Sequence, residues 1–253
     1  MHARERHRLA LQALEEHGEV TVAQLSRTTG VSEMTIRRDL EALERKGLLR
    51  RVHGGAITAV SRGYEPPFAL RASRRGDEKV RIGQAAAALV GEAEALIIDV
   101  GTTPLELARA LTARTGLTIL TPNLRAAELL TQNPDLRVIV TGGIARPGEL
   151  SLVGDLAERA FADLRCDTVF LGAGGIDPDA GVTEFNLDDA RVKRAALASA
   201  RRCVVLADST KLERVAVASV CPLDRVDVLV TDEGASDDVV ARFVEHEVEV
   251  VRA

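Results

Sequence analysis

Four glycine- or threonine-bearing stretches follow short apolar runs in the second part of the chain, and each could bind an anion. They are Asp99-Val100-Gly101-Thr102-Thr103, Thr141-Gly142-Gly143 with Arg146 beyond it, Gly172-Ala173-Gly174-Gly175, and Asp208-Ser209-Thr210-Lys211. Glycines let backbone N–H groups approach a phosphate, and threonine hydroxyls and the start of a helix supply further donors. Lys211 and Arg146 add positive charge, while Asp99 can accept a hydrogen bond from a sugar hydroxyl. These residue types favour a phosphorylated ligand.

Each of these stretches also has a structural explanation. Glycine-rich turns between a strand and a helix are common, and Gly174 and Gly175 fit a tight turn as well as a ligand contact. An aspartate after a strand often caps a helix or its own turn. Binding is favoured because all four stretches would converge on one edge of a parallel sheet, where ligands collect.

A second set of polar residues, with a different chemistry, lies in VSEMTIRRDLEALERKG, residues 31–47. Apolar residues recur there at spacings of four and three and predict one face of a helix: Ile36, Leu40 and Leu43. Polar and basic residues project from the other side, near the N-terminal end: Ser32, which has the residue type of an N-cap, Thr35, Arg37 and Arg38. A helix that reads base edges needs such side chains in its first two turns. The residues leave open whether Arg37 and Arg38 contact bases or phosphates.

The flanking sequence predicts the rest of a winged helix-turn-helix. Residues 4–17 predict a helix that ends at Gly18, and TVAQLSRTT, from Thr21, predicts a shorter one. In LLRRVHGGAI the pair Gly54-Gly55 predicts the turn of a β-wing. The wing would present three residues to phosphates: Arg50, Arg51 and His53. A small helical bundle with a solvated charged face is the alternative that helix spacing alone leaves open.

From Lys79 onward the pattern alternates between helix and strand. Apolar runs typical of buried strands occur at 95–99, 117–120, 136–140, 167–171, 203–207, 226–230 and 247–251. Helical stretches lie near 79–91, 104–114, 124–132, 154–164, 187–200 and 236–246. The repetition predicts an α/β fold with a mostly parallel sheet covered by helices. Residues 58–78 lose periodicity, contain Pro66-Pro67 and four arginines, and are expected to form an exposed linker in which Arg74 and Arg75 are solvated.

Composition bounds the class of protein. The 253 residues are 46% apolar and 28% charged, which fits a globular protein that can bury a core. The formal net charge is −5, yet residues 1–55 carry ten Lys and Arg against eight Asp and Glu, as a DNA-binding part on an acidic body would. Cys166, Cys203 and Cys221 lack metal-ligand spacing and are expected to be reduced core residues. With no membrane-spanning apolar run and no signal-type segment, a cytoplasmic protein is expected.

The run from Val20 to Ala56, with VS, TIRRDL and a closing HGGA, resembles the DNA-binding part of the DeoR family of bacterial transcriptional regulators. DVGTT, TGG with its arginine, SLVG, LGAGGID, GVT and ADSTK, in this order, are similar to that family's effector domain. The resemblance implies a sensor that resembles ribose-phosphate isomerases in fold and binds phosphorylated sugars. Carried over position by position, it implies these effector residues: Asp99, Gly101, Thr102, Thr103, Gly142, Gly143, Arg146, Gly172 and Lys211.

This chain departs from the family pattern at two places. Thr121-Pro122-Asn123 stands where the family often has Thr-Asn-Ser, so Asn123 is expected to supply the polar group from one place later. Asp189 stands at a position usually held by glutamate, one methylene longer. Both changes bear on the identity of the ligand, and both residues join the expected effector site.

The expected organisation is a winged helix-turn-helix over 1–57, a linker over 58–78 and an α/β effector-sensing domain over 79–253. The expected function is that of a sequence-specific transcriptional regulator, a repressor of a sugar or carbohydrate operon that a phosphorylated sugar releases from operator DNA. A homodimer or homotetramer is expected, because helix-turn-helix proteins gain affinity from two half-sites. No metal, cofactor, membrane contact or catalytic residue is expected.

Two other functions fit the residues. A sugar-phosphate isomerase with a regulatory DNA-binding part would need a carboxylate base, and Asp99, Asp188, Asp189 and Asp208 are available. A small-molecule-binding module whose first part contacts other proteins is the third possibility. Salt-dependent binding to duplex DNA would separate this last function from a regulator.

Overall fold

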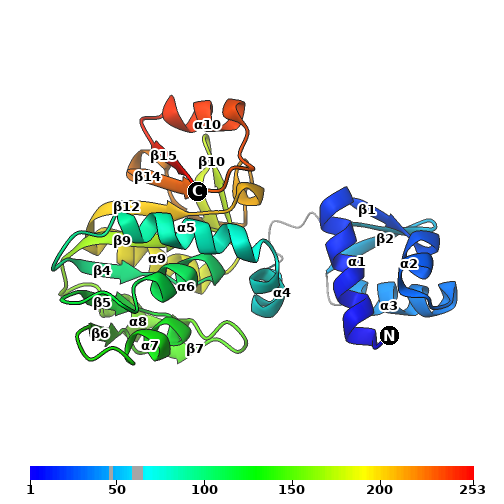
Figure 1. The fold of residues 1–253 in the computed structure, drawn as a ribbon, viewed down its shortest axis with the longest axis horizontal. Coiled ribbons are helices and arrows are strands. Elements are labelled where there is room, and N and C mark those ends of the chain that lie inside the picture. The colour runs from blue at the N-terminus through cyan, green and yellow to red at the C-terminus, as the bar shows by residue number, and fades with distance from the viewer. Residues whose placement is uncertain (46–47, 59–64) are drawn as a thin grey trace. The chain divides into compact units, whose positions relative to one another are not determined.

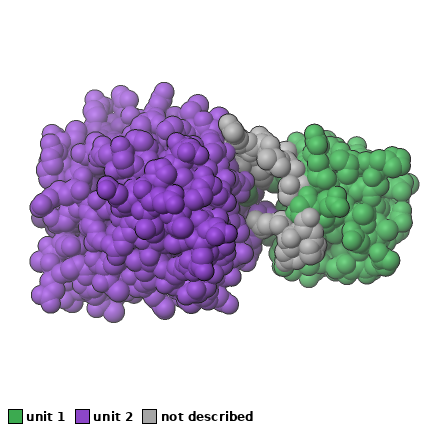
Figure 2. Space-filling view, turned by 90° about the horizontal axis from the view of Figure 1, so that it is seen from above, with its two compact units in different colours: residues 1–66 green, residues 67–253 purple. Residues whose placement is uncertain are grey.

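The computed structural model describes residues 1–45, 48–58 and 65–253, and the chain divides into two compact units. The first unit is Met1–Pro66 and the second is Pro67–Ala253, as Figure 2 shows in separate colours. The division falls inside the stretch 58–78 that composition predicts to be a linker. Gly47, the expected end of a helix, and residues 59–64 of that stretch lie outside the described residues.

The first unit combines three helices with a small antiparallel sheet (Figure 1). Its elements are α1 (Ala3–His17), β1 (Glu19–Thr21), α2 (Val22–Thr29), α3 (Glu33–Arg45), β2 (Leu49–Val52) and β3 (Gly55–Thr58). The strand order is β1-β3-β2, and Gly54 takes a φ of 81° in the turn of the β2–β3 hairpin. Gly18, at a φ of 74°, ends α1, and its N–H donates to the Leu14 carbonyl. This is the winged helix-turn-helix that the sequence predicts.

Helix α3 is held by both apolar and ionic contacts. The predicted apolar face is buried, with Ile36, Leu40 and Leu43 each no more than 2% exposed. Between them the carboxylate of Asp39 is also buried and accepts from Arg6 Nε at 2.6 Å, while His7 Nε2 lies 3.1 Å from its other oxygen. Since Arg6 and His7 belong to α1, this cluster fixes the orientation of α3 on α1.

The second unit is built on a seven-stranded parallel sheet with the strand order β15-β14-β12-β9-β4-β5-β6. The strands are β4 (Ala95–Ile98), β5 (Thr118–Thr121), β6 (Arg137–Val140), β9 (Cys166–Gly172), β12 (Ala200–Leu206), β14 (Val228–Thr231) and β15 (Glu249–Arg252). All seven correspond to the predicted apolar runs. The order reverses between β4 and β9, and in open parallel sheets ligands bind at the carboxyl ends of the strands at such a point.

Helices cover both faces of this sheet and bury two hydrophobic clusters (Figure 1). One face packs against α5 (Gly76–Ala88), α6 (Thr102–Ala110) and α7 (Leu124–Leu130). The other packs against α8 (Asp155–Arg159), α9 (Leu187–Ser199) and α10 (Asp237–Val244). Burial on both faces explains why the strands read as continuous apolar runs instead of alternating ones.

Three features differ from the sequence expectations. Residues 67–78 are not linker, because α4 (Phe68–Ser73) and the start of α5 occupy them. Arg75 is exposed, as expected, but it also forms an ion pair with buried Asp232. The helix expected at 154–164 ends early, at Arg159. Two small antiparallel sheets were not expected. They pair β7 (Ile144–Ala145) with β8 (Leu152–Val153), and β10 (Gly175–Asp177) and β13 (Ala218–Cys221) with β11 (Gly181–Glu184).

Candidate functional site

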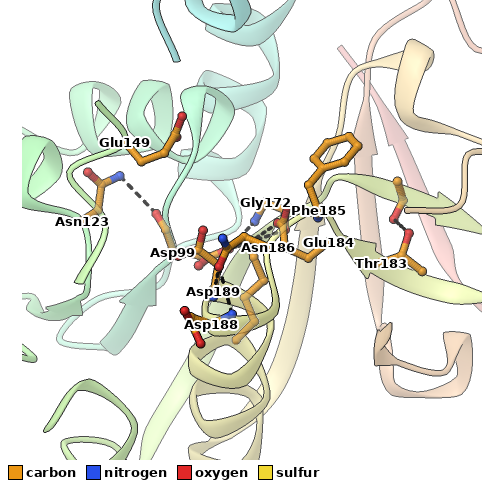
Figure 3. Close-up of polar contacts among 12 residues, drawn as sticks. Asp99, Asn123, Glu149, Gly172, Thr183, Glu184, Phe185, Asn186, Asp188 and Asp189 are labelled. Atoms are coloured by element: carbon orange, nitrogen blue, oxygen red, sulfur yellow. Dashed lines mark hydrogen bonds and ion pairs between the residues drawn. The ribbon is translucent and has the colours of Figure 1, made fainter. Parts of the chain in front are cut away.

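A buried cluster of charges occupies the point where the sheet order reverses. Asp99 follows β4, and its Oδ2 accepts from the backbone N–H of Gly172, the last residue of β9, at 2.9 Å. The Lys193 ammonium, from α9, donates to the same oxygen and also to the Gly172 carbonyl at 2.8 Å. A second carboxylate, Glu184 of β11, lies 3.2 Å from the ammonium. Figure 3 shows Asp99 between Asn123 on one side and Glu184 and Asp189 on the other.

This charged cluster is buried inside the second unit and so also contributes to its fold. The side chains of Lys193 and Asp99 are 1% and 2% exposed. Burial alone would lower the pKa of Lys193, but the Asp99 and Glu184 carboxylates raise it above its ordinary value, so the lysine stays charged. Sequence reasoning missed Lys193 and Glu184. The available signal was a lysine three residues from both Ala190 and Ala196 on the buried side of a helix.

The hairpin β7–β8 brings together two predicted effector residues that are 43 positions apart in the sequence. Arg146, in the hairpin turn, forms an ion pair with Asp189 in the first turn of α9. Burial raises the pKa of Asp189 to about 6, although Arg146 and Lys193 oppose the shift. The hydroxyl of Ser151 lies beside the Asp189 carboxylate and also opposes the shift, and within the described residues neither this hydroxyl nor Asp189 Oδ1 has another hydrogen-bond partner. The site therefore holds polar atoms that a hydroxylated ligand could satisfy.

Glycines 142 and 143 shape the entry to this hairpin. They follow Thr141, at the carboxyl end of β6, with φ angles of 75° and 112°. A Cβ on Gly143 would lie 2.6 Å from the Val153 carbonyl oxygen, so only glycine fits there. Gly172 is constrained in the same way, because a Cβ would lie 2.8 Å from the Val100 carbonyl oxygen. Both glycines have a packing reason to be glycine.

The DVGTT stretch forms the β4–α6 turn. Gly101 precedes α6 with a φ of 125°, and Thr102 and Thr103 are buried in its first turn. Asn123 sits beside this turn, where its Nδ2 donates to the Asp99 carbonyl at 3.3 Å. Its Oδ1 accepts from the first N–H groups of α7, so Asn123 is a helix cap in this structure.

Lys211 lies at the end of the short 3₁₀ helix η1 (Ser209–Lys211), which follows β12. Its ammonium is 5.6 Å from the centroid of the buried Phe185 ring, and the described part of the chain gives it no hydrogen bond or ion pair. Burial lowers the pKa of Lys211 to about 8. The carboxylate of Asp208 opposes the shift, and the positive charges of Arg214, Arg71 and Lys79 add to it. A partly buried cation with three other cations near it is a favourable place for an anion.

The predicted DNA-facing residues lie on the exposed side of α3. Ser32 caps the helix, with its hydroxyl accepting from the Thr35 N–H at 3.3 Å and lying 3.0 Å from the Thr35 hydroxyl. Arg37 is exposed and pairs with Glu33 at 3.2 Å, while Arg38 is exposed beside it. This face presents one hydroxyl pair and two guanidinium groups to solvent.

The wing carries the other three predicted residues. Arg50, Arg51 and His53 are all exposed on β2 and the adjoining turn. The Arg51 backbone N–H donates to Glu44 Oε1 of α3 at 2.8 Å, which ties the wing to the helix. The seven predicted residues thus all lie in the first unit, and the predicted effector residues all lie in the second.

No group of three His, Cys, Asp or Glu side chains within the described ranges could hold a metal ion. The three cysteines are buried and unpaired with one another. No helix of the described chain is long and apolar enough to cross a membrane.

Comparison with known proteins matches both units to one family. The DeoR-like helix-turn-helix domain matches residues 6–62, and the DeoR C terminal sensor domain matches residues 74–233. The HTH-type transcriptional regulator GolR of Listeria innocua is 34% identical, with 94% of each chain covered. The putative aga operon transcriptional repressor of Escherichia coli O157:H7 is 32% identical over 98% of this chain and 93% of its own length. The glycerol-3-phosphate regulon repressor of E. coli K12 is 31% identical over 97% of both chains.

Among solved structures, ribose 5-phosphate isomerase A from Methanocaldococcus jannaschii is 17% identical to the matched part of this chain. The match covers 54% of each chain with a TM-score of 0.42.

Proposed function

We infer the function from one premise: the chain belongs to the DeoR family of DNA-binding transcriptional regulators. We propose that it is a repressor of a sugar or carbohydrate operon and that a phosphorylated sugar, bound in the second unit, releases it from operator DNA. The names of the related aga operon and glycerol-3-phosphate regulon repressors support this assignment. The site of action would be the bacterial cytoplasm, where operator DNA lies.

The proposed DNA contacts use the exposed face of α3 and the wing. Helix α3 would enter the major groove, with Thr35, Arg37 and Arg38 toward base edges and phosphates. The wing residues Arg50, Arg51 and His53 would meet the phosphate backbone. Two copies of the chain would engage two half-sites, since one α3 reads only a few base pairs, so a homodimer or homotetramer is proposed.

One observation carries the proposed ligand class: the Lys211 ammonium is partly buried near three other cations and forms no ion pair in the described chain, although Asp208 is near enough to offset part of this charge. A dianionic phosphate bound beside Lys211 would compensate the positive charge and raise the pKa of the lysine back toward its ordinary value. The donors of the β4–α6 turn at Gly101, Thr102 and Thr103 would add to this site. At the other end, the unsatisfied oxygens of Asp189 and Ser151 suit sugar hydroxyls.

An isomerase is not proposed. The four carboxylates that could act as a base all have partners. Asp99 contacts Lys193 and Gly172, and Asp189 contacts Arg146. Asp188 lies 3.6 Å from Arg191, and Asp208 accepts from the Thr210 N–H at 3.1 Å. The relatives reported above are regulators by name. We therefore assign no catalytic residue to this chain.

Switching requires that the ligand favour one of two states of the protein and that DNA favour the other. The test uses the purified full chain, duplex DNA from upstream of its own operon, and a panel of triose, tetrose, pentose and hexose phosphates with their unphosphorylated sugars. A thermal-shift screen selects the ligand, because a ligand that binds only the folded state raises the melting temperature. We expect one phosphorylated member to stabilise the chain and to weaken DNA binding. Stabilisation by the unphosphorylated sugar alone would contradict the proposed ligand class.

A further inference from the structure

Helix α4 is the first element of the second unit, directly after the last residues of the first. Its Arg71 forms an ion pair with Glu149 in the turn of the β7–β8 hairpin, and both side chains are about seven-eighths buried, at 15% and 13% exposure. Beside this pair, the Arg125 guanidinium stacks on the Phe68 ring at 4.2 Å and donates to the Gly148 carbonyl at 2.9 Å. The hairpin that supplies Arg146 to the effector site therefore also contacts α4.

The C-terminal end of α4 is fixed over the carboxyl edge of the sheet. The ammonium of buried Lys79 donates to the carbonyls of Arg71 and Arg74, the latter at 2.7 Å, and so satisfies the end of the helix. Arg75 then donates to Asp232 and to the Ser209 hydroxyl, both at 3.2 Å. Because Asp232 follows β14 and Ser209 follows β12, the segment 68–79 lies along the same edge of the sheet as the candidate effector site.

Arg71 and Lys211 stand on segments that touch, because Arg75 donates to the hydroxyl of Ser209, the first residue of η1, and η1 ends at Lys211. The charge of Arg71 contributes to the lowered pKa of Lys211. Glu149 forms an ion pair with Arg71, whereas Lys211 forms no ion pair in the described chain and is offset only by the more distant charge of Asp208. A dianion between the two cations would compensate both at once, and a guanidinium binds a phosphate with two parallel hydrogen bonds.

We propose that Arg71 is an effector-binding residue that exchanges Glu149 for the phosphate of the ligand. This inference rests on the proposed function, because it assumes a phosphorylated effector at Lys211. It adds a ligand contact from α4, the helix that continues from the first unit. Loss of the Arg71–Glu149 pair on binding would remove one of the two contacts that hold α4 to the hairpin, so the ligand would act directly on the segment that leads to the DNA-binding unit.

The direction in which two substitutions change the affinity for phosphate tests the proposed exchange of Glu149 for phosphate at Arg71. Arg71→Gln removes a ligand contact, so we expect the affinity of the full chain for inorganic phosphate to fall at least tenfold in titration calorimetry. Glu149→Gln removes the competitor for the same guanidinium, so we expect the affinity to rise about threefold or more. If the ion pair only holds α4 in place, both variants lose its docking and both affinities fall. A weaker affinity in Glu149→Gln would therefore overturn the proposal.

Matched controls separate these effects from changes in net charge and folding. Arg81→Gln on α5 and Glu128→Gln on α7 make the same charge changes at exposed positions and should leave phosphate affinity within twofold of wild type. Arg71→Lys keeps the positive charge and should recover part of the lost affinity. If Arg71→Gln binds as tightly as wild type, this inference fails and the proposed function stands. If wild type binds neither inorganic phosphate nor any sugar phosphate, both fail.

Discussion

The two units place their functional side chains in opposite environments. In the first unit, Arg37 and Arg38 stand in solvent on a helix whose other face is buried, and the neighbouring Glu33–Arg37 pair is more than half exposed. In the second, the pairs that shape the site are buried, above all Lys193 with Asp99. A DNA-reading surface must meet a large polyanion from outside, whereas a sensor must surround a small ligand. The same kinds of ion pair should therefore have very different energetic weight in the two units.

The largest expected effect is that of Lys193→Met. The substitution leaves the Asp99 and Glu184 carboxylates buried without their cation, and breaking a buried pair in this way costs about 3–5 kcal/mol. Urea unfolding of the full chain should show the loss in the second unit, with the first unit's transition unchanged. A loss below about 1 kcal/mol would show that burial does not separate the two units as described.

Arg38→Ala should weaken operator binding by about 1–3 kcal/mol, which is roughly tenfold to a hundredfold. It should leave the sugar-phosphate affinity and the stability of the chain nearly unchanged, because the side chain is exposed. Fluorescence anisotropy at several salt concentrations would also assign its partner: loss of a phosphate contact lowers the salt dependence, whereas loss of a base contact relaxes sequence preference. An equal loss of effector affinity would contradict the division of labour.

Lys211→Met should stabilise the chain while abolishing its response to the effector. The folded pKa of about 8 lies below the ordinary 10.5, so the unfolded chain holds this proton more tightly. The lysine therefore costs folding free energy that is fully present below pH 8 and disappears as the pH rises to 10.5. At pH 7 the variant should gain roughly 1–3 kcal/mol. Denaturant unfolding between pH 7 and 10.5 tests this prediction. A stability gain of Lys211→Met that did not shrink with rising pH would contradict it.

The smallest effect is expected for Glu33→Gln in the first unit. Its pair with Arg37 is a solvent-exposed contact between residues four apart on a helix, and such pairs contribute about 0.3–0.5 kcal/mol. Thermal unfolding should place the variant within about 0.5 kcal/mol of wild type, in contrast with Lys193→Met. A larger loss would mean that the exposed pair is stronger than its environment allows.

The contrast between the units also explains how much of the structure can be predicted from the sequence. Periodicity alone places Ile36, Leu40 and Leu43 inward, because a helix has a fixed repeat. The seven apolar runs predict seven strands for a different reason: a strand buried on both faces is continuously apolar. Local rules of this kind describe the first unit almost completely.

Long-range pairing lies beyond those rules. Lys193 and Glu184 reach Asp99 only after β4, β9, β11 and α9 have assembled, and no local spacing records that meeting. Residues 67–78 read as linker because their arginines look solvated, yet Arg75 pairs with Asp232, 157 residues away. The order of the motifs identifies candidate residues of the effector domain. The ion-pair partners of its charged residues can be known only from the tertiary structure.

The central claim is that a ligand in the second unit controls DNA binding by the first. The most direct measurement is the operator affinity of the full chain, with and without the sugar phosphate that stabilises it most, for wild type and Lys211→Met. We predict at least a tenfold loss of wild-type affinity on adding the ligand, and no change in the variant, whose affinity without ligand equals that of wild type. Equal responses of the two proteins, or no response in wild type, would contradict the account.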